Sequence, residues 1–174
     1  MTNDKSRMHF ESATEEHLRF FAEWRKVDRL EQHTCRPVVE GKRIPPDGVT
    51  VCWIFWSEEI EQPIGRFSYF DMNPRNRSAE FGYFVNPNFR RQGLGTRMLT
   101  IAIDHLFATT HLNKLYCQTG AFNTASVRLL EKLGFHLDGI LREHHELDGI
   151  FWDDYLYSTL RCEWISRHLP GSNT

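Results

Sequence analysis

The chain has 174 residues, of which 40% are hydrophobic and 25% are charged, and this composition is ordinary for a globular protein with a substantial core. A net charge of −2 gives no electrostatic reason to expect binding to nucleic acid. No apolar run approaches the ~18 residues of a membrane-spanning helix, and the four cysteines form no Cys-x-x-Cys pair, so the usual signals for a membrane anchor, a zinc site or a redox motif are missing.

The first third of the chain indicates a strand, a helix and a long connection. Residues 8–13 read as a short strand, and Ser12 with Glu15, or Thr14 alone, can cap the helix that follows. That helix carries apolar residues at helical spacing: Leu18, Phe21, Trp24 and Val27. Residues 29–48 contain three prolines and two glycines, which predicts an irregular connection of a length that is usually functional in a compact domain.

Three strands at hairpin spacing are predicted next, over residues 49–56, 63–70 and 79–85. Polar turns separate them, and Pro87 ends the third because proline cannot donate to a β-ladder. Strands this close in sequence favour an antiparallel sheet.

The next segments alternate between helix and strand. Residues 96–107 form a strongly amphipathic pattern that predicts a helix, and residues 114–119 read as a strand. A second helix is predicted over residues 123–133, with Gly134 as its terminator.

Two long strands, 135–147 and 150–160, are predicted to complete the chain before a frayed tail. Asp148-Gly149 between them favours a type I′ hairpin turn. The element order predicts an α+β fold with a mixed sheet. We expect one domain over residues 1–174, with an ordered core from 8 to 168, in a cytoplasmic protein that is a monomer or a homodimer.

The stretch Arg90–Thr96, Arg-Arg-Gln-Gly-Leu-Gly-Thr, lies between a predicted strand and a predicted helix. Glycines allow close approach of the backbone, freed N–H groups and the helix dipole favour an anion, and two arginines add positive charge. A surface turn with two solvated arginines is the alternative. The stretch is neither a P-loop, which needs Lys-Ser or Lys-Thr after the glycine, nor a dinucleotide fingerprint, because residue 98 is Met.

This stretch resembles the pyrophosphate loop of the GNAT N-acetyltransferases, Arg/Gln-x-x-Gly-x-Gly/Ala, which Arg90, Gly93 and Gly95 match position by position. The segment 123–135 resembles a second signature, that of the ribosomal-protein N-acetyltransferase branch of the family. The late sequence Gly149-x-x-Trp152-x-Asp154 is similar to that branch as well.

The resemblance implies a GNAT fold, in which a mixed, mostly antiparallel sheet with splayed central strands is flanked by helices. It also implies acetyl-CoA as the cofactor, with its pantetheine arm between the splayed strands and a backbone N–H near Phe84 or Val85 on the thioester oxygen. The expected cofactor-binding residues are Phe84, Val85, Arg90, Arg91, Gln92, Gly93, Leu94, Gly95, Thr96, Asn123 and Ser126.

Two side chains are candidates for the chemistry of amine acetylation. Glu80 is the expected base, acting through a water, because the amine must lose a proton at neutral pH. The alternative is a carboxylate paired with an arginine such as Arg66 or Arg77. Many relatives protonate the leaving thiolate with a tyrosine, but the matching residue here is Leu130; Ser126 is therefore the expected donor, unless its hydroxyl only bonds the helix backbone.

Trp53, Trp56 and Trp152 are candidates for the walls of an acceptor slot, with core packing as the alternative for each. The run Glu143-His144-His145-Glu146 suggests a metal cluster. On a strand, however, its residues alternate between two faces, so we interpret it as a solvated face and predict no metal site.

The predicted activity is transfer of the acetyl group from acetyl-CoA to a primary amine in a ternary complex. Charges in residues 29–48 are mixed, and residues 49–56 carry no charge and two tryptophans. This balance favours a protein N-terminus or a small amine with an apolar neighbour, although the acidic turn at 58–61 would suit a polycation. The alternatives are a polyamine, amino sugar, amino acid or antibiotic amine as acceptor, and a non-catalytic acyl-CoA-binding module.

Overall fold

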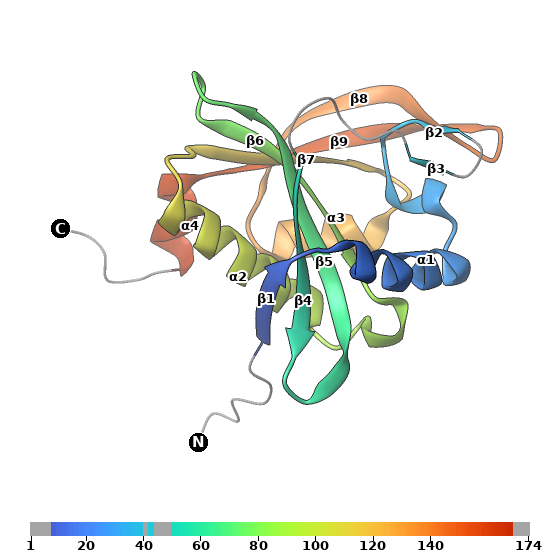
Figure 1. Ribbon diagram of the computed structural model, residues 1–174. Coiled ribbons are helices and arrows are strands. Elements are labelled where there is room, and N and C mark those ends of the chain that lie inside the picture. Colours follow the sequence, from blue (N-terminus) through green and yellow to red (C-terminus); the bar gives the residue numbers. More distant parts are fainter. Residues whose placement is uncertain (1–7, 40–41, 44–49, 169–174) are drawn as a thin grey trace.

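A computed structural model describes residues 8–39, 42–43 and 50–168 (Figure 1). Its main sheet has seven strands in the order β1-β4-β5-β6-β7-β9-β8. The strands of this sheet are β1 (Met8–Ser12), β4 (Val51–Ser57), β5 (Ile60–Asn73), β6 (Ser78–Val85), β7 (Lys114–Gly120), β8 (His136–Leu147) and β9 (Ile150–Leu160). The α-helices are α1 (Leu18–Val27), α2 (Leu94–Thr109), α3 (Thr124–Lys132) and α4 (Arg161–His168).

The sheet opens between its two central strands. β6 and β7 are parallel neighbours, whereas every other neighbouring pair in this sheet is antiparallel. They pair only where Ser78–Glu80 lies beside Lys114–Tyr116. Beyond these residues, β6 remains paired with β5 as far as Val85, and β7 remains paired with β9 as far as Gly120. Two intact half-sheets therefore diverge, which confirms the predicted mixed sheet with splayed central strands.

Helices cover both faces of the sheet. α2 buries an apolar stripe that includes Met98, Leu99, Ile103 and Leu106, each at most 1% exposed, against the larger core cluster. Each such side chain contributes about 1.5–3 kcal/mol by leaving water. α1 packs Phe21 and Trp24 onto Ile54, on the opposite face of β4 from Phe55. Because adjacent residues of a strand point to opposite faces, β4 is buried on both sides.

Turns that depend on local chemistry are as predicted. Asp148 and Gly149 both have positive φ, 55° and 79°, as a type I′ turn between β8 and β9 requires. Gly134 follows α3 with φ of 77°, a left-handed conformation that glycine adopts without strain.

The start of α1 differs from the prediction. A 3₁₀ turn, Glu15–His17, comes first, and α1 begins at Leu18 without a side-chain cap. The imidazole of His17 instead accepts a hydrogen bond from the Thr14 backbone N–H at 3.0 Å. Val27, expected on the buried face, is 66% exposed because α1 ends there.

Two regions contain more regular structure than the sequence predicted; one helical turn within residues 29–48 was expected, but not the strands there or the last helix. Within the connection at 29–48 lie a 3₁₀ turn, Leu30–His33, and the short antiparallel pair β2 (Val38–Val39) and β3 (Lys42–Arg43). After β9 the chain forms α4, whose Trp164 is fully buried and donates to Asp104 of α2 at 2.7 Å. α4 thereby fixes the last strand to the α2 layer.

Candidate functional site

The loop between β6 and α2 has the backbone geometry of an anion site. Arg91 and Gly93 have φ of 61° and 80°, and Gly93 is the N-cap residue of α2. The hydrogen bond from the Arg97 N–H to the Gly93 carbonyl, 3.2 Å, closes the first turn. The N–H groups of residues 93–96 precede this bond, so they have no acceptor within the helix, and the helix dipole makes their end positive.

The two glycines of this loop have different roles. Gly93 supplies the left-handed turn, and nothing lies within 4 Å of a Cβ built there. A Cβ on Gly95 would lie 3.1 Å from Val85 Cγ2 and 3.4 Å from Leu129 Cδ2. Gly95 therefore lets the first turn of α2 pack closely against the end of β6 and against α3.

Arg90 is turned inward rather than toward the loop amides. Its Nη2 lies 2.5 Å from Asp28 Oδ2, its Nε donates to the Val85 carbonyl at 3.2 Å, and its guanidinium lies over the Phe84 ring. Arg90 thus ties the end of α1 to the end of β6. Arg91 and Gln92 are exposed, so Arg91 is the arginine of the pair that is accessible to a bound anion.

The end of β6 presents a backbone donor to the gap. The Asn86 N–H donates to the Ile64 carbonyl on the β5 side at 2.9 Å. Because peptide groups alternate along a strand, the Val85 N–H points to the opposite edge, toward β7. Of the two residues expected near the thioester oxygen, the geometry favours Val85; the Phe84 ring stacks on Trp24, with centroids 5.9 Å apart.

At the start of α3, Ser126 forms a hydrogen bond with a half-buried tyrosine. Tyr83 Oη and Ser126 Oγ are 2.7 Å apart. Burial raises the pKa of Tyr83, so its hydroxyl is protonated at neutral pH and can donate to Ser126. Asn123 caps α3, because its Oδ1 accepts from the Ser126 N–H at 3.2 Å.

Tyr83 is a site residue that the sequence did not single out. Alternation along β6 places it with Phe81 and Val85 on one face, but no local pattern shows that α3 begins beside it. Leu130, at the position of the usual tyrosine, is fully buried in the core.

On the α1 face of the sheet, Glu80 forms an ion pair with Arg36, a partner that the sequence did not suggest. Arg36 Nη2 donates to Glu80 Oε2 and to Asp71 Oδ2, both at 2.8 Å. Burial first, and then the charges of Glu80 and Asp71, raise the pKa of the neighbouring Tyr116. Arg36 lies in the connection at 29–48, so this connection reaches the middle of the sheet.

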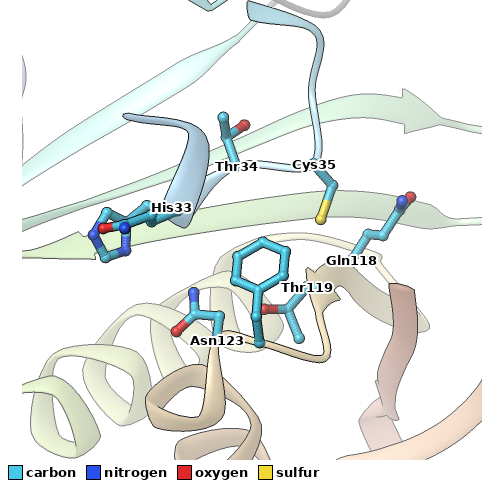
Figure 2. A pocket seen from close by; sticks show the side chains of 9 residues that line it. His33, Thr34, Cys35, Gln118, Thr119 and Asn123 are labelled. Atoms are coloured by element: carbon cyan, nitrogen blue, oxygen red, sulfur yellow. The ribbon is translucent and has the colours of Figure 1, made fainter. Parts of the chain in front are cut away.

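A small cavity adjoins the gap, and Figure 2 shows the segment around His33–Cys35 on one side and Gln118, Thr119 and Asn123 on the other. Its lining comes from the segment after α1 and from the junction of β7 with α3. The lining residues are Gln32, His33, Thr34, Cys35, Gln118, Thr119, Gly120, Phe122 and Asn123. The expected cofactor contact Asn123 and the connection at 29–48 thus meet in one place.

The three candidate tryptophans lie in different surroundings. Trp53 is a core residue, 7% exposed, with its ring 5.2 Å from His105 of α2, so the expectation that it lines an acceptor slot is wrong. Trp56 packs at the start of α1, donating to Glu11 Oε1 at 2.9 Å. Trp152 is 36% exposed and lies 5.9 Å from Phe122, which lines the cavity.

Comparison with known proteins agrees with this geometry. Residues 2–136 match the acetyltransferase (GNAT) domain. The chain belongs to the GNAT acetyltransferase family. No helix within the described residues is long and apolar enough to cross a membrane.

Two curated relatives and one solved structure illustrate the similarity. The uncharacterized N-acetyltransferase p20 of Bacillus licheniformis is 29% identical over 107 residues, 62% of this chain and 60% of the relative. Spermidine N(1)-acetyltransferase of Escherichia coli strain K12 is 27% identical over 108 residues, 62% of this chain and 58% of the relative. The matched segments thus span less than two thirds of these relatives.

The crystal structure of spermidine N-acetyltransferase from Vibrio cholerae in complex with CoA and spermine has a TM-score of 0.77 at 20% identity, over 91% of this chain and 98% of that chain. At this identity the similarity shows the GNAT fold.

Proposed function

We propose that this protein is an acetyl-CoA-dependent N-acetyltransferase that acts on a primary amine in a ternary complex. The gap between β6 and β7 carries the proposal, because the strands pair only at Ser78–Glu80 with Lys114–Tyr116 and then diverge toward the loop at the start of α2. An extended, polar chain fits between two strand edges whose peptide groups face each other without pairing. Bound acetyl-CoA supplies the activated acetyl group as a thioester.

The residues around the gap have separate roles in the proposed acetyl transfer. The amides of residues 93–96 bind phosphate, and the Val85 N–H stabilises negative charge on the thioester oxygen. Glu80 accepts the proton of the attacking amine through a water. Ser126, with the Tyr83 hydroxyl behind it at 2.7 Å, donates a hydrogen bond to the sulfur as the C–S bond breaks.

The charges near the gap favour an acceptor with one ammonium group. A polyamine needs several carboxylates without partners, whereas here Arg36 bridges Glu80 and Asp71, and Arg90 pairs with Asp28. The aromatic pair Phe122 and Trp152 offers an apolar wall beside the cavity. We therefore infer a protein N-terminus or a small amine with an apolar neighbour, in keeping with the ribosomal-protein branch that segment 123–135 resembles.

A polyamine acceptor is the second candidate, and the similarity to spermidine acetyltransferases favours it. A screen of acetyl-CoA turnover by release of free thiol separates the two candidates. It compares N-terminal peptides, amino-acid derivatives, spermidine and an aminoglycoside. We expect a peptide or an apolar amine to have the highest kcat/KM. Spermidine or the aminoglycoside ahead by tenfold would overturn the acceptor class, and tight binding of acetyl-CoA without turnover of any amine would indicate a binding module instead.

Ser126→Ala is expected to lower kcat by about tenfold while the affinity for acetyl-CoA changes little, because the lost hydrogen bond forms mainly in the transition state. Thr124→Ala is the matched control, since it removes an exposed hydroxyl from the same helical turn. Steady-state kinetics and calorimetry of both variants check this expectation. An equal loss in both variants would show that Ser126 only supports the helix.

A further inference from the structure

A thiol, an imidazole and a carboxylate converge beside the cavity from three separate parts of the chain. Cys35 lies between the 3₁₀ turn Leu30–His33 and β2, His145 lies on β8, and Asp154 lies on β9. Their donor atoms all lie within 4.8 Å of one another. His145 Nδ1 and Asp154 Oδ1 are 3.6 Å apart.

His145 belongs to the run at 143–146 that the sequence suggested to be a solvated strand face. That expectation is wrong for His145, whose side chain is 10% exposed, although His144 and Glu146 on the other face are exposed. Pairing of His145 with Trp152 places it on the face of β9 that carries Asp154. The segment with Cys35 covers this face, which strand alternation alone could not reveal.

Asp154 is a buried carboxylate that lacks a full set of partners. It is 0% exposed; its Oδ2 accepts from Gln118 Nε2 at 2.6 Å and the carboxylate also interacts with the Cys35 thiol, but no nitrogen or oxygen donor within the described part of the chain reaches its Oδ1. Among those residues, His145 is its one basic contact, at a distance too long for a hydrogen bond. Burial of a carboxylate is unfavourable unless a cation or donors compensate it.

The Cys35 thiol is not activated as a nucleophile. Burial, and then the Asp154 carboxylate, raise the pKa of Cys35 above its usual value, so the thiol stays protonated and is a poor nucleophile. A bound divalent cation reverses this preference, because a coordinated thiol loses its proton.

We propose that Cys35 Sγ, His145 Nδ1 and Asp154 Oδ1 form a binding site for Zn²⁺. Thiolate, imidazole and carboxylate are the ligands that zinc prefers, and three protein ligands leave a fourth position for water or another donor. Zinc–ligand bonds of about 2.0–2.3 Å place tetrahedral donors roughly 3.3–3.8 Å apart. The pair His145 and Asp154 already has this spacing, and a small inward movement of Cys35 completes the site.

The fourth position would face the cavity. Cys35 and Gln118 line the cavity, and Figure 2 shows the Cys35 sulfur directed from its segment toward the strand that carries Gln118. Because Arg36 follows Cys35 directly, zinc would also hold Arg36 on Glu80 and Asp71. This site borders the cavity and the proposed base, but its test needs no acetyl acceptor.

The test is titration of the chelator-treated protein with Zn²⁺, followed by calorimetry, and with Co²⁺, followed by absorption. We expect one ion per chain, a thiolate-to-cobalt charge-transfer band, and an affinity that rises with pH because the Cys35 proton is released. Cys35→Ser and His145→Asn should each weaken binding by more than about tenfold. The matched controls Cys162→Ser and His144→Asn change an exposed thiol and an exposed imidazole, and they should bind as the parent does.

Thermal unfolding with and without Zn²⁺ adds a readout that is independent of enzyme activity. Zn²⁺ should raise the Tm of the parent and of both controls, but not that of Cys35→Ser. A parent protein that takes up no Zn²⁺, or a cobalt complex without the thiolate band, would overturn the proposal whether or not the variants fold. Unchanged affinity in both Cys35→Ser and His145→Asn would do so as well.

Discussion

Gly95→Asp is expected to weaken binding of acetyl-CoA by well over tenfold, about 2 kcal/mol or more. The substitution places a carboxylate in the first turn of α2, where the N–H groups of residues 93–96 face an anion and a second negative charge repels it. The new Cβ also meets Val85 Cγ2 at 3.1 Å, which pushes the helix away from the end of β6. Both effects act on the same contact between loop and phosphate, and calorimetry with acetyl-CoA and CoA measures their sum.

Gly95→Ala separates the effect of the added charge from the effect of the added Cβ on packing. It brings the same Cβ toward Val85 and Leu129 but no carboxylate, and the loop pattern of the family accepts alanine at this position. We expect a much smaller loss of affinity for this variant. A parent-like affinity in Gly95→Asp would refute the assignment of the loop. Equal losses in both variants would assign the effect to packing rather than to phosphate recognition.

Features set by neighbouring residues were predictable from the sequence. The Asp148-Gly149 turn, the left-handed Gly134 and the glycine loop ahead of α2 follow from backbone conformations that few other residues adopt. The antiparallel pairing of β4, β5 and β6 also followed, because strands at hairpin spacing pair with their neighbours in sequence.

Features set by distant parts of the chain were not predictable in this way. β4 is covered on both faces, so its pattern could not show that Trp53 faces α2 while Ile54 faces α1. The partners of the candidate site residues likewise come from far away in sequence. Arg36 reaches Glu80 across 44 positions, and Tyr83 reaches Ser126 across 43. The connection that supplies Arg36 has no periodic pattern, and only its position over the sheet shows its partners.

Glu80→Gln is expected to lower kcat/KM by about a hundredfold at pH 7, the usual contribution of a general base. For an alkylamine acceptor with a pKa of about 10, roughly one molecule in a thousand is unprotonated at pH 7, but about a quarter is unprotonated at pH 9.5. The need for a base falls accordingly, so the activities of the variant and the parent should approach each other as the pH rises. Glutamine keeps the shape of the side chain and a hydrogen-bond acceptor for Arg36, so little else should change.

Asp71→Asn is the control that separates proton transfer from positioning. Arg36 Nη2 lies 2.8 Å from both Asp71 Oδ2 and Glu80 Oε2, so each variant removes one of the two negative charges that hold the guanidinium. Asparagine also tolerates the positive φ of residue 71, which is 52°. If Glu80 acts only by holding Arg36, the two variants should lose similar activity, in the same proportion at every pH. If Glu80 is the base, only Glu80→Gln should regain activity at high pH, because a substrate that arrives as the free amine no longer requires a carboxylate to remove its proton.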